Sequence, residues 1–155
     1  MNKNQKLKLE DGVEAVNQRQ FRSLIGGLIY LTHTRPDISF SVGVVSRFMS
    51  NPSKQHYGAA KRILRYIIGT LNYGIWYTQV RDFKLVGFTN SDWATSADDR
   101  RSTSGNMFGF GSSAVTWCSK KQSIITLSIA KAEYVAATTA ACQCIWLRRM
   151  LCDLQ

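Results

Sequence analysis

Two polar residues at the end of an apolar run could take part in metal chemistry. The run FKLVGFTNSDW has the composition of a β-strand, and it ends with an amide, Asn90, and a carboxylate, Asp92. Oxygen atoms at that position suit a divalent cation, because hard cations prefer oxygen ligands. Asn90 and Asp92 would share one face of the strand, about 6.5 Å apart along it. The alternative is that both residues belong to an ordinary polar turn.

A second carboxylate, Glu133, lies in the segment 128–155, which is rich in Ala, contains no Gly or Pro, and predicts one long helix. Steps of four and three residues from Glu133 define an apolar stripe that should face a sheet. The stripe contains Ala137, Ala140, Cys144, Leu147, Leu151 and Leu154. Glu133 is therefore either an edge residue that reaches water or a metal-facing carboxylate opposite FTNSDW. The Cys and His spacings do not indicate a zinc site.

The chain is strongly basic, with a formal net charge of +10 and a pI near 9.8. Such a charge favours polyanionic partners, either nucleic acid or an anionic membrane surface. A protein with a plain excess of Lys and Arg would have the same composition. If nucleic acid is the partner, seven basic side chains are expected to contact phosphates: Lys61, Arg62, Arg65, Arg100, Arg101, Lys120 and Lys121.

Hydrophobic periodicity divides the 155 residues into a helical half and a half that contains strands. Helical spacing and capping residues predict helices over 20–32, 36–51 and 53–69. Short β-branched and aromatic runs predict at least three antiparallel strands, with candidates at 74–78, 83–92, 106–111 and 114–121. The fold class is therefore α+β or α/β. The expected domains are a disordered N-terminus at 1–18, a helical region at 19–72 and a sheet-containing region at 73–155.

Several motifs in a fixed order resemble the end of a Copia-type retrotransposon polyprotein. They are SLIGGLIYLTHTRPDISFSV, SRFMSNPS, HYGAAKRILRYIIGT, TNSDWA, DDRRSTSG, WCSKKQ, LSIAKAEYVAA and WLRRML. The resemblance covers nearly the whole chain from about Phe21 onward. It implies a helical connection region of a reverse transcriptase, followed by a truncated RNase H-like domain with a β-meander and a long C-terminal helix. The first strand, 83–92, would then have an open edge.

RNase H domains of this family hold two divalent metal ions with four acidic residues and cut the RNA strand of a hybrid. The resemblance implies that Asn90 stands at the first acid and Glu133 at the second, with Lys131 where the family often has another acid. The other two acids are expected beyond the long helix, after Gln155. Asp92 is too far along the strand to substitute for Asn90. A non-enzymatic protein with vestigial metal positions and no cofactor is expected, and Mg²⁺ would matter only to residual activity.

A second resemblance concerns the tetrapeptide RILR, an RxLR motif formed by Arg62, Ile63, Leu64 and Arg65. Oomycete plant pathogens secrete a large family of effectors with this motif, and the whole chain is similar to a Copia-like member of that family. The resemblance implies secretion, entry into the cytoplasm or nucleus of a host plant cell, and binding of a host plant protein to suppress defence or cell death. The same tetrapeptide is also ordinary for a Copia connection helix.

The residues alone indicate a different compartment. The N-terminus lacks the apolar segment of a signal peptide, no acidic dEER motif accompanies RILR, and no stretch is long enough to span a membrane. On these grounds the chain would be intracellular. The main hypothesis is a secreted, non-enzymatic effector on a degenerate RNase H-like scaffold. The alternative is a retroelement fragment that binds nucleic acid with little or no nuclease activity, and a reading frame without a selected role is a further possibility.

Overall fold

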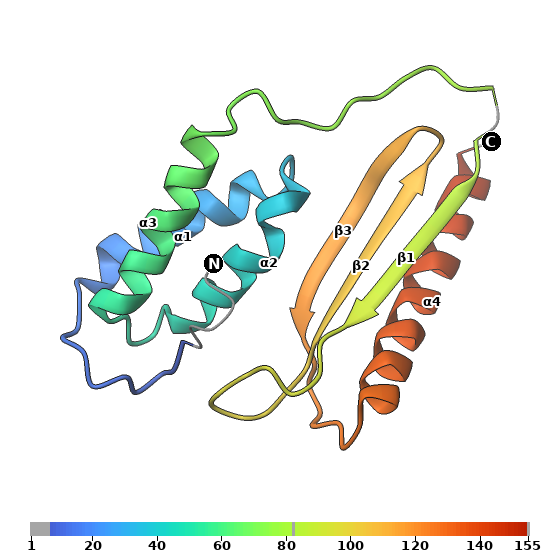
Figure 1. Ribbon diagram of the computed structural model, residues 1–155. Coiled ribbons are helices and arrows are strands. Elements are labelled where there is room, and N and C mark those ends of the chain that lie inside the picture. Colours follow the sequence, from blue (N-terminus) through green and yellow to red (C-terminus); the bar gives the residue numbers. More distant parts are fainter. Residues whose placement is uncertain (1–6, 82, 155) are drawn as a thin grey trace. The chain divides into compact units, whose positions relative to one another are not determined.

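A computed structural model describes residues 7–81 and 83–154 of the chain. The chain separates into two compact units, Met1–Gly74 and Ile75–Gln155, and each is described by itself. The first unit contains three α-helices, and the second contains a three-stranded antiparallel sheet with one long helix (Figure 1). This order of helices, β-meander and C-terminal helix confirms the predicted α+β class. Within the described ranges, no helix is both long and apolar enough to cross a membrane.

Three α-helices and a short 3-10 helix form the first unit. They are α1 (Gln18–Leu31), α2 (Pro36–Val45), η1 (Ser46–Phe48) and α3 (Lys54–Ile68). Each α-helix begins where the sequence supplies a start signal. The Asn17 side chain accepts a hydrogen bond from the N–H of Gln20, and Pro36 occupies the first turn of α2. Ser53 caps α3 in a capping box with His56, which confirms the predicted cap.

The apolar faces of these helices form one core. Its buried residues are Phe21, Ile25, Leu28, Ile38, Val42, Val45, Ala59, Ala60 and Ile63. Burial of each large aliphatic or aromatic side chain stabilises the unit by about 1.5–3 kcal/mol. The basic residues of α3 lie outside this core because they occupy the other faces of an amphipathic helix.

A buried arginine joins the start of α2 to the chain that follows α3. The guanidinium of Arg35 makes a two-point hydrogen bond with the carboxylate of Asp37, at 2.9 and 2.7 Å. It also donates to the carbonyl of Thr70 at 3.0 Å and to the Thr70 hydroxyl at 2.7 Å. The hydrogen bond from Arg35 lowers the pKa of Asp37 below its ordinary value. At least one of the residues that make the chain basic therefore has a structural role.

The segment before α1 is more ordered than the sequence predicts. Disorder is expected over 1–18, but residues 7–17 run along the start of α3 and hydrogen-bond to the chain there. One such bond joins the N–H of Val16 to the carbonyl of Pro52 at 2.9 Å. The prediction is wrong for 7–17 because the segment is held by polar contacts, which hydrophobic periodicity does not register. The remaining expectation, for residues 1–6, lies outside the described part of the chain.

The sheet of the second unit has the strand order β1-β2-β3, and both pairings are antiparallel. Its strands are β1 (Leu85–Ser91), β2 (Thr103–Phe110) and β3 (Ser113–Lys121). The turn between β2 and β3 contains Gly111, whose φ of 68° suits glycine. The register of that hairpin shifts between Phe108 and Gly109. This strand order places β1 at an edge of the sheet, where the resemblance predicts an open edge.

The run at 74–78 is not a strand of this sheet. The N–H of Thr78 donates to the hydroxyl of Ser112 at 2.9 Å, and the hydroxyl of Tyr77 donates to the carbonyl of Ala114 at 2.8 Å. The segment therefore contacts the β2–β3 turn and the start of β3 through individual hydrogen bonds that involve side chains, and not through a strand ladder. Of the strands predicted for this half, three are present in the described residues.

The helix α4 (Ile129–Asp153) packs on β1 and β2 and covers one face of the sheet (Figure 1). Ser128 caps it by accepting a hydrogen bond from the N–H of Lys131 at 3.2 Å. The residues that α4 buries are Ala132, Ala136 and Ala140. The predicted stripe is wrong by one position at this end, since Ala137 is exposed, and Leu154 at the other end is exposed as well. The small side chains of these alanines let the helix approach the sheet closely. A hydrophobic pattern does not distinguish alanine from larger apolar residues, so it does not identify this face.

Candidate functional site

The candidate metal positions lie where β1 ends beside the first turns of α4. Glu133 is in the second turn of α4 and is half-buried. Its Oε1 atom accepts a hydrogen bond from the backbone N–H of Ser91 at 3.2 Å. The next N–H, that of Asp92, donates to the carbonyl of Thr103 in β2, so the N–H of Ser91 points away from β2. Glu133 therefore occupies the open edge of β1, opposite the FTNSDW run as the sequence predicts.

Asn90 lies on the other face of β1. The hydroxyl of Ser91 faces α4, because the same Gln122 side chain that contacts it at 3.2 Å also reaches the carbonyl of Ala132 in α4. Successive side chains of a strand point to opposite faces, so Asn90 is directed away from α4, and it is exposed. The strand thus turns the amide of Asn90 away from the face on which α4 packs.

Asp92 organises the turn that follows β1. Its carboxylate accepts hydrogen bonds from the backbone N–H of Thr103 and from the hydroxyl of Thr95. Its own N–H donates to the carbonyl of Thr103 at 3.0 Å. Both carboxylate oxygens are therefore occupied by the protein, which is the arrangement expected of ordinary turn chemistry.

Gln122, which is not among the predicted site residues, connects three elements at this end of the sheet. It follows β3 and is buried. Its Nε2 atom lies 2.8 Å from the hydroxyl of Ser104, 3.2 Å from that of Ser91 and 3.0 Å from the carbonyl of Ala132. Its Oε1 atom is buried without a hydrogen-bond partner. The only sequence signal for this role is a polar residue that directly follows a strand, within WCSKKQ.

The geometry of these residues fits a strand edge held to a helix. In the two ranges that the structure describes, no three His, Cys, Asp or Glu side chains are grouped so as to hold a metal ion. Asp92 is committed to its turn, and Glu133 is bonded to Ser91. A neutral amide at Asn90 brings no negative charge to a cation.

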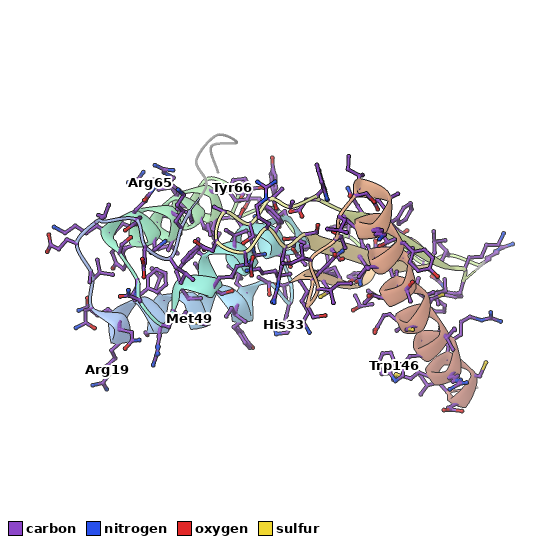
Figure 2. All side chains as sticks on the ribbon, turned by 90° about the horizontal axis from the view of Figure 1, so that it is seen from below. Arg19, His33, Met49, Arg65, Tyr66 and Trp146 are labelled. Carbon is purple, nitrogen blue, oxygen red and sulfur yellow. The ribbon has the colours of Figure 1, made fainter. Side chains whose placement is uncertain are left out.

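The basic face of α3 is the second candidate site. Its exposed members from the predicted phosphate set are Lys61, Arg62 and Arg65. The ammonium of Lys61 lies 4.8 Å from the centre of the Tyr57 ring, which is a cation–π distance. Figure 2 labels Arg65 on the same helix. Between the two arginines, Ile63 is buried and Leu64 packs against the core. The RILR tetrapeptide is therefore one turn of an amphipathic helix, with its arginines outside and its apolar residues inside.

The other predicted phosphate contacts lie in the second unit and divide into two groups. The basic atoms of Arg101 and Lys121 lie 3.6 and 2.6 Å from the carboxylate of Asp99. Burial opposes the charge on Asp99, but hydrogen bonds, that from Lys121 foremost, outweigh it and lower the pKa of Asp99 to about 2. Arg100 and Lys120 are exposed. Two of these four cations are therefore already paired with a carboxylate of the chain.

Comparison with known proteins finds relatives of two kinds. The chain is 44% identical over 135 residues to the Retrovirus-related Pol polyprotein from transposon TNT 1-94 of Nicotiana tabacum, covering 86% of this chain and 10% of the polyprotein. It is 37% identical over 149 residues to that from transposon RE1 of Arabidopsis thaliana, covering 96% and 10%. It is 42% identical over 128 residues to Secreted RxLR effector protein 161 of Plasmopara viticola, covering 82% and 90%. The chain belongs to the Pol family of Copia-type retrotransposons.

This membership confirms the resemblance that the motifs indicate. The Copia-type chain spans about a tenth of the length of the polyproteins that it matches. No protein-family model matches it, and no solved structure does. The roles of Asn90, Asp92 and Glu133 as vestigial positions of a Copia-type RNase H stay predictions.

Proposed function

We propose that this Copia-type Pol segment binds nucleic acid through the basic face of α3 and does not hydrolyse it. The observation that supports this most directly is the exposure of Lys61, Arg62 and Arg65 on a helix whose opposite face is anchored in a core. Residues 1–74 contain 11 Lys and Arg against 4 Asp and Glu, whereas 75–155 contain 9 against 6. Cations on a rigid helix bind phosphates without reading the base sequence.

The lack of hydrolysis follows from the chemistry at the end of β1. Two-metal cleavage needs several anionic oxygens at about 2.1 Å from the ions. Asn90 offers only an amide, on the strand face away from α4, and Asp92 is bonded within its turn. Glu133 is then the one carboxylate directed toward this strand end from α4, and one carboxylate does not hold a metal pair.

Binding and cleavage are tested with the same labelled RNA–DNA hybrid. Fluorescence anisotropy between 50 and 200 mM salt should show an affinity that falls as salt rises, since phosphate contacts release counterions. The hybrid should stay intact on incubation with Mg²⁺ or Mn²⁺. Affinity that is absent or does not change with salt would contradict the proposed binding. Metal-dependent cleavage of the RNA strand would contradict the proposed lack of hydrolysis.

A second candidate function rests on the relative from Plasmopara viticola, whose name describes a secreted RxLR effector. Under this alternative the chain is secreted, reaches the cytoplasm or nucleus of a host plant cell, and binds a host protein to suppress cell death. The position of Ile63 and Leu64 in the helical core gives RILR a structural explanation that needs no such role. Expression in plant cells with a cell-death elicitor tests the alternative, and unchanged cell death would exclude it.

A further inference from the structure

Residues 7–16, which we call the N-terminal strap, are hydrogen-bonded to the start of α3. Two backbone hydrogen bonds join them, from the Lys54 N–H to the Glu14 carbonyl and from the Val16 N–H to the Pro52 carbonyl, both at 2.9 Å. Side chains add further contacts, among them the Ser53 hydroxyl to Asp11 Oδ2 at 2.5 Å and His56 Nε2 to the Lys8 carbonyl at 2.9 Å. Leu7, at the beginning of the strap, packs against the helical core. His56 is the one titratable ring among these contacts.

The contacts of His56 determine where its proton lies. The side chain is fully buried, with an exposure of 0%. Its Nδ1 atom accepts the N–H of Ser53 at 2.9 Å, so the ring proton is on Nε2, which donates to the carbonyl of Lys8. The ring of Phe48 stacks on the imidazole with centroids 4.0 Å apart. Every one of these contacts fits a neutral imidazole.

We propose that His56 is a pH-sensitive latch, and that its protonation releases the N-terminal strap from α3. A proton on Nδ1 would oppose the N–H of Ser53 and take away that N–H group's acceptor, and only the Ser53 hydroxyl oxygen, 3.0 Å away, could accept the added proton. It would also place a charge in a fully buried site beside Phe48. In the released form the imidazole reaches water, where both ring nitrogens can bind protons without a buried charge or an opposed donor. Because the released form binds one more proton, acidification favours release.

The charged groups around His56 modify this balance. Asp11 is linked to it through Ser53, whose hydroxyl lies 3.0 Å from Nδ1. The hydrogen bond from Ser53 lowers the pKa of Asp11, so this carboxylate stays ionised over the range in which histidine titrates and favours the closed, protonated form. Lys54 and Glu14, on α3 and the strap, pair with each other at 2.5 Å. Asp11 therefore sets how acidic the solution must become before the strap opens.

Amide hydrogen exchange of the full chain, followed by NMR from pH 7.5 to 5.5, tests the latch. The readout is the protection of the Val16 and Lys54 amides relative to that of Ile63 in α3, a ratio that cancels the intrinsic pH dependence of exchange. We expect the ratio to fall by about tenfold per pH unit, the limit for uptake of one proton on release, and the pH at which half of the fall has occurred is the midpoint. His33→Gln, which removes the exposed histidine, should leave this unchanged, and His56→Gln should abolish it.

A protection ratio that stays constant to pH 5.5 would overturn the proposal, and so would an equal fall in the His56→Gln variant. If His56→Gln does not fold, Asp11→Asn provides the second test. Loss of the Asp11 carboxylate should move the midpoint to higher pH, and an unmoved midpoint would contradict the latch. These outcomes do not depend on whether the chain binds nucleic acid.

Discussion

The carboxylate of Glu133, on α4, accepts a hydrogen bond from the backbone N–H of Ser91, the last residue of β1, at 3.2 Å. That N–H points away from β2, so a helix side chain supplies the acceptor that an adjoining strand would otherwise supply. An acid at a position associated with metal chemistry thus stabilises the edge of a sheet. A role in metal binding is not needed to explain the placement of Glu133.

Replacement of Glu133 should separate its hydrogen bond from its charge. Glu133→Ala leaves the N–H of Ser91 without this acceptor and should lower the free energy of unfolding by about 1 kcal/mol. Glu133→Gln should lower it much less, because the amide oxygen still accepts. Urea unfolding of the purified chain measures both. Equal losses in the two variants would show that the charge, and not the hydrogen bond, is what matters.

Truncation of Gln122 should lower the free energy of unfolding more than replacement of Glu133 does. Gln122→Ala removes the donor that reaches β1, β2 and α4, and should destabilise the second unit by about 2–3 kcal/mol. Gln79 is exposed and provides a matched control, since Gln79→Ala should change stability by less than about 0.5 kcal/mol. Thermal unfolding followed by circular dichroism compares them, and similar melting temperatures would refute the connecting role of Gln122.

Two strand glycines should respond differently to a methyl group. A Cβ atom on Gly87 would lie 2.6 Å from Cε1 of Phe108, whose ring is buried over that position, whereas one on Gly105 would have its nearest neighbours at 4.0 Å. Gly87→Ala should therefore cost about 1–3 kcal/mol through overpacking, and Gly105→Ala should be close to neutral. Chemical denaturation measures the free energy of unfolding of both variants. An unchanged free energy of unfolding in Gly87→Ala would mean that Phe108 can move aside.

The ion pairs of Asp99 predict a dependence on pH. Its pKa of about 2 lies below the ordinary value of 3.8, so its stabilising contribution is present above about pH 4 and is lost as pH falls toward 2. Asp99→Asn should cost about 1 kcal/mol at pH 7, a small value because solvent screens a side chain that is 33% exposed. Unfolding at pH 7 and pH 2.5 should show this difference shrinking with acid. A difference that stays constant over that range would contradict it.

The helices of the first unit could be predicted because local signals and core packing agree. Pro36, Ser53 and the apolar spacing of 53–69 define starts and faces that the structure reproduces. The N-terminal strap at 7–16 could not be predicted, since its contacts are polar and join residues that are mostly distant in sequence. The run at 74–78 has strand composition, but its hydrogen bonds go to Ser112 in the turn and to Ala114 at the start of β3, and they do not form a strand ladder.

The site was predicted in part. The sequence places Glu133 opposite the end of the first strand, and the structure joins it to Ser91 there. Periodicity assigned Glu133 to the buried stripe, whereas Ala132 and Ala136 occupy it, because a one-position rotation of a helix barely alters an Ala-rich pattern. The role of Gln122 depends on three elements meeting, which no local pattern encodes.

Binding of nucleic acid through α3 is tested most directly by two variants that remove the same number of charges. The first, Lys61→Gln/Arg62→Gln/Arg65→Gln, alters α3, and the second, Lys131→Gln/Arg148→Gln/Arg149→Gln, alters three exposed cations of α4. The measurement is the affinity for a labelled RNA–DNA hybrid against salt concentration. The α3 variant should lose about 2 to 3 from the slope of log affinity against log salt, and the α4 variant should keep a slope near that of the unmodified chain. Equal slopes in the two variants, or a loss confined to the α4 variant, would contradict the proposed interface.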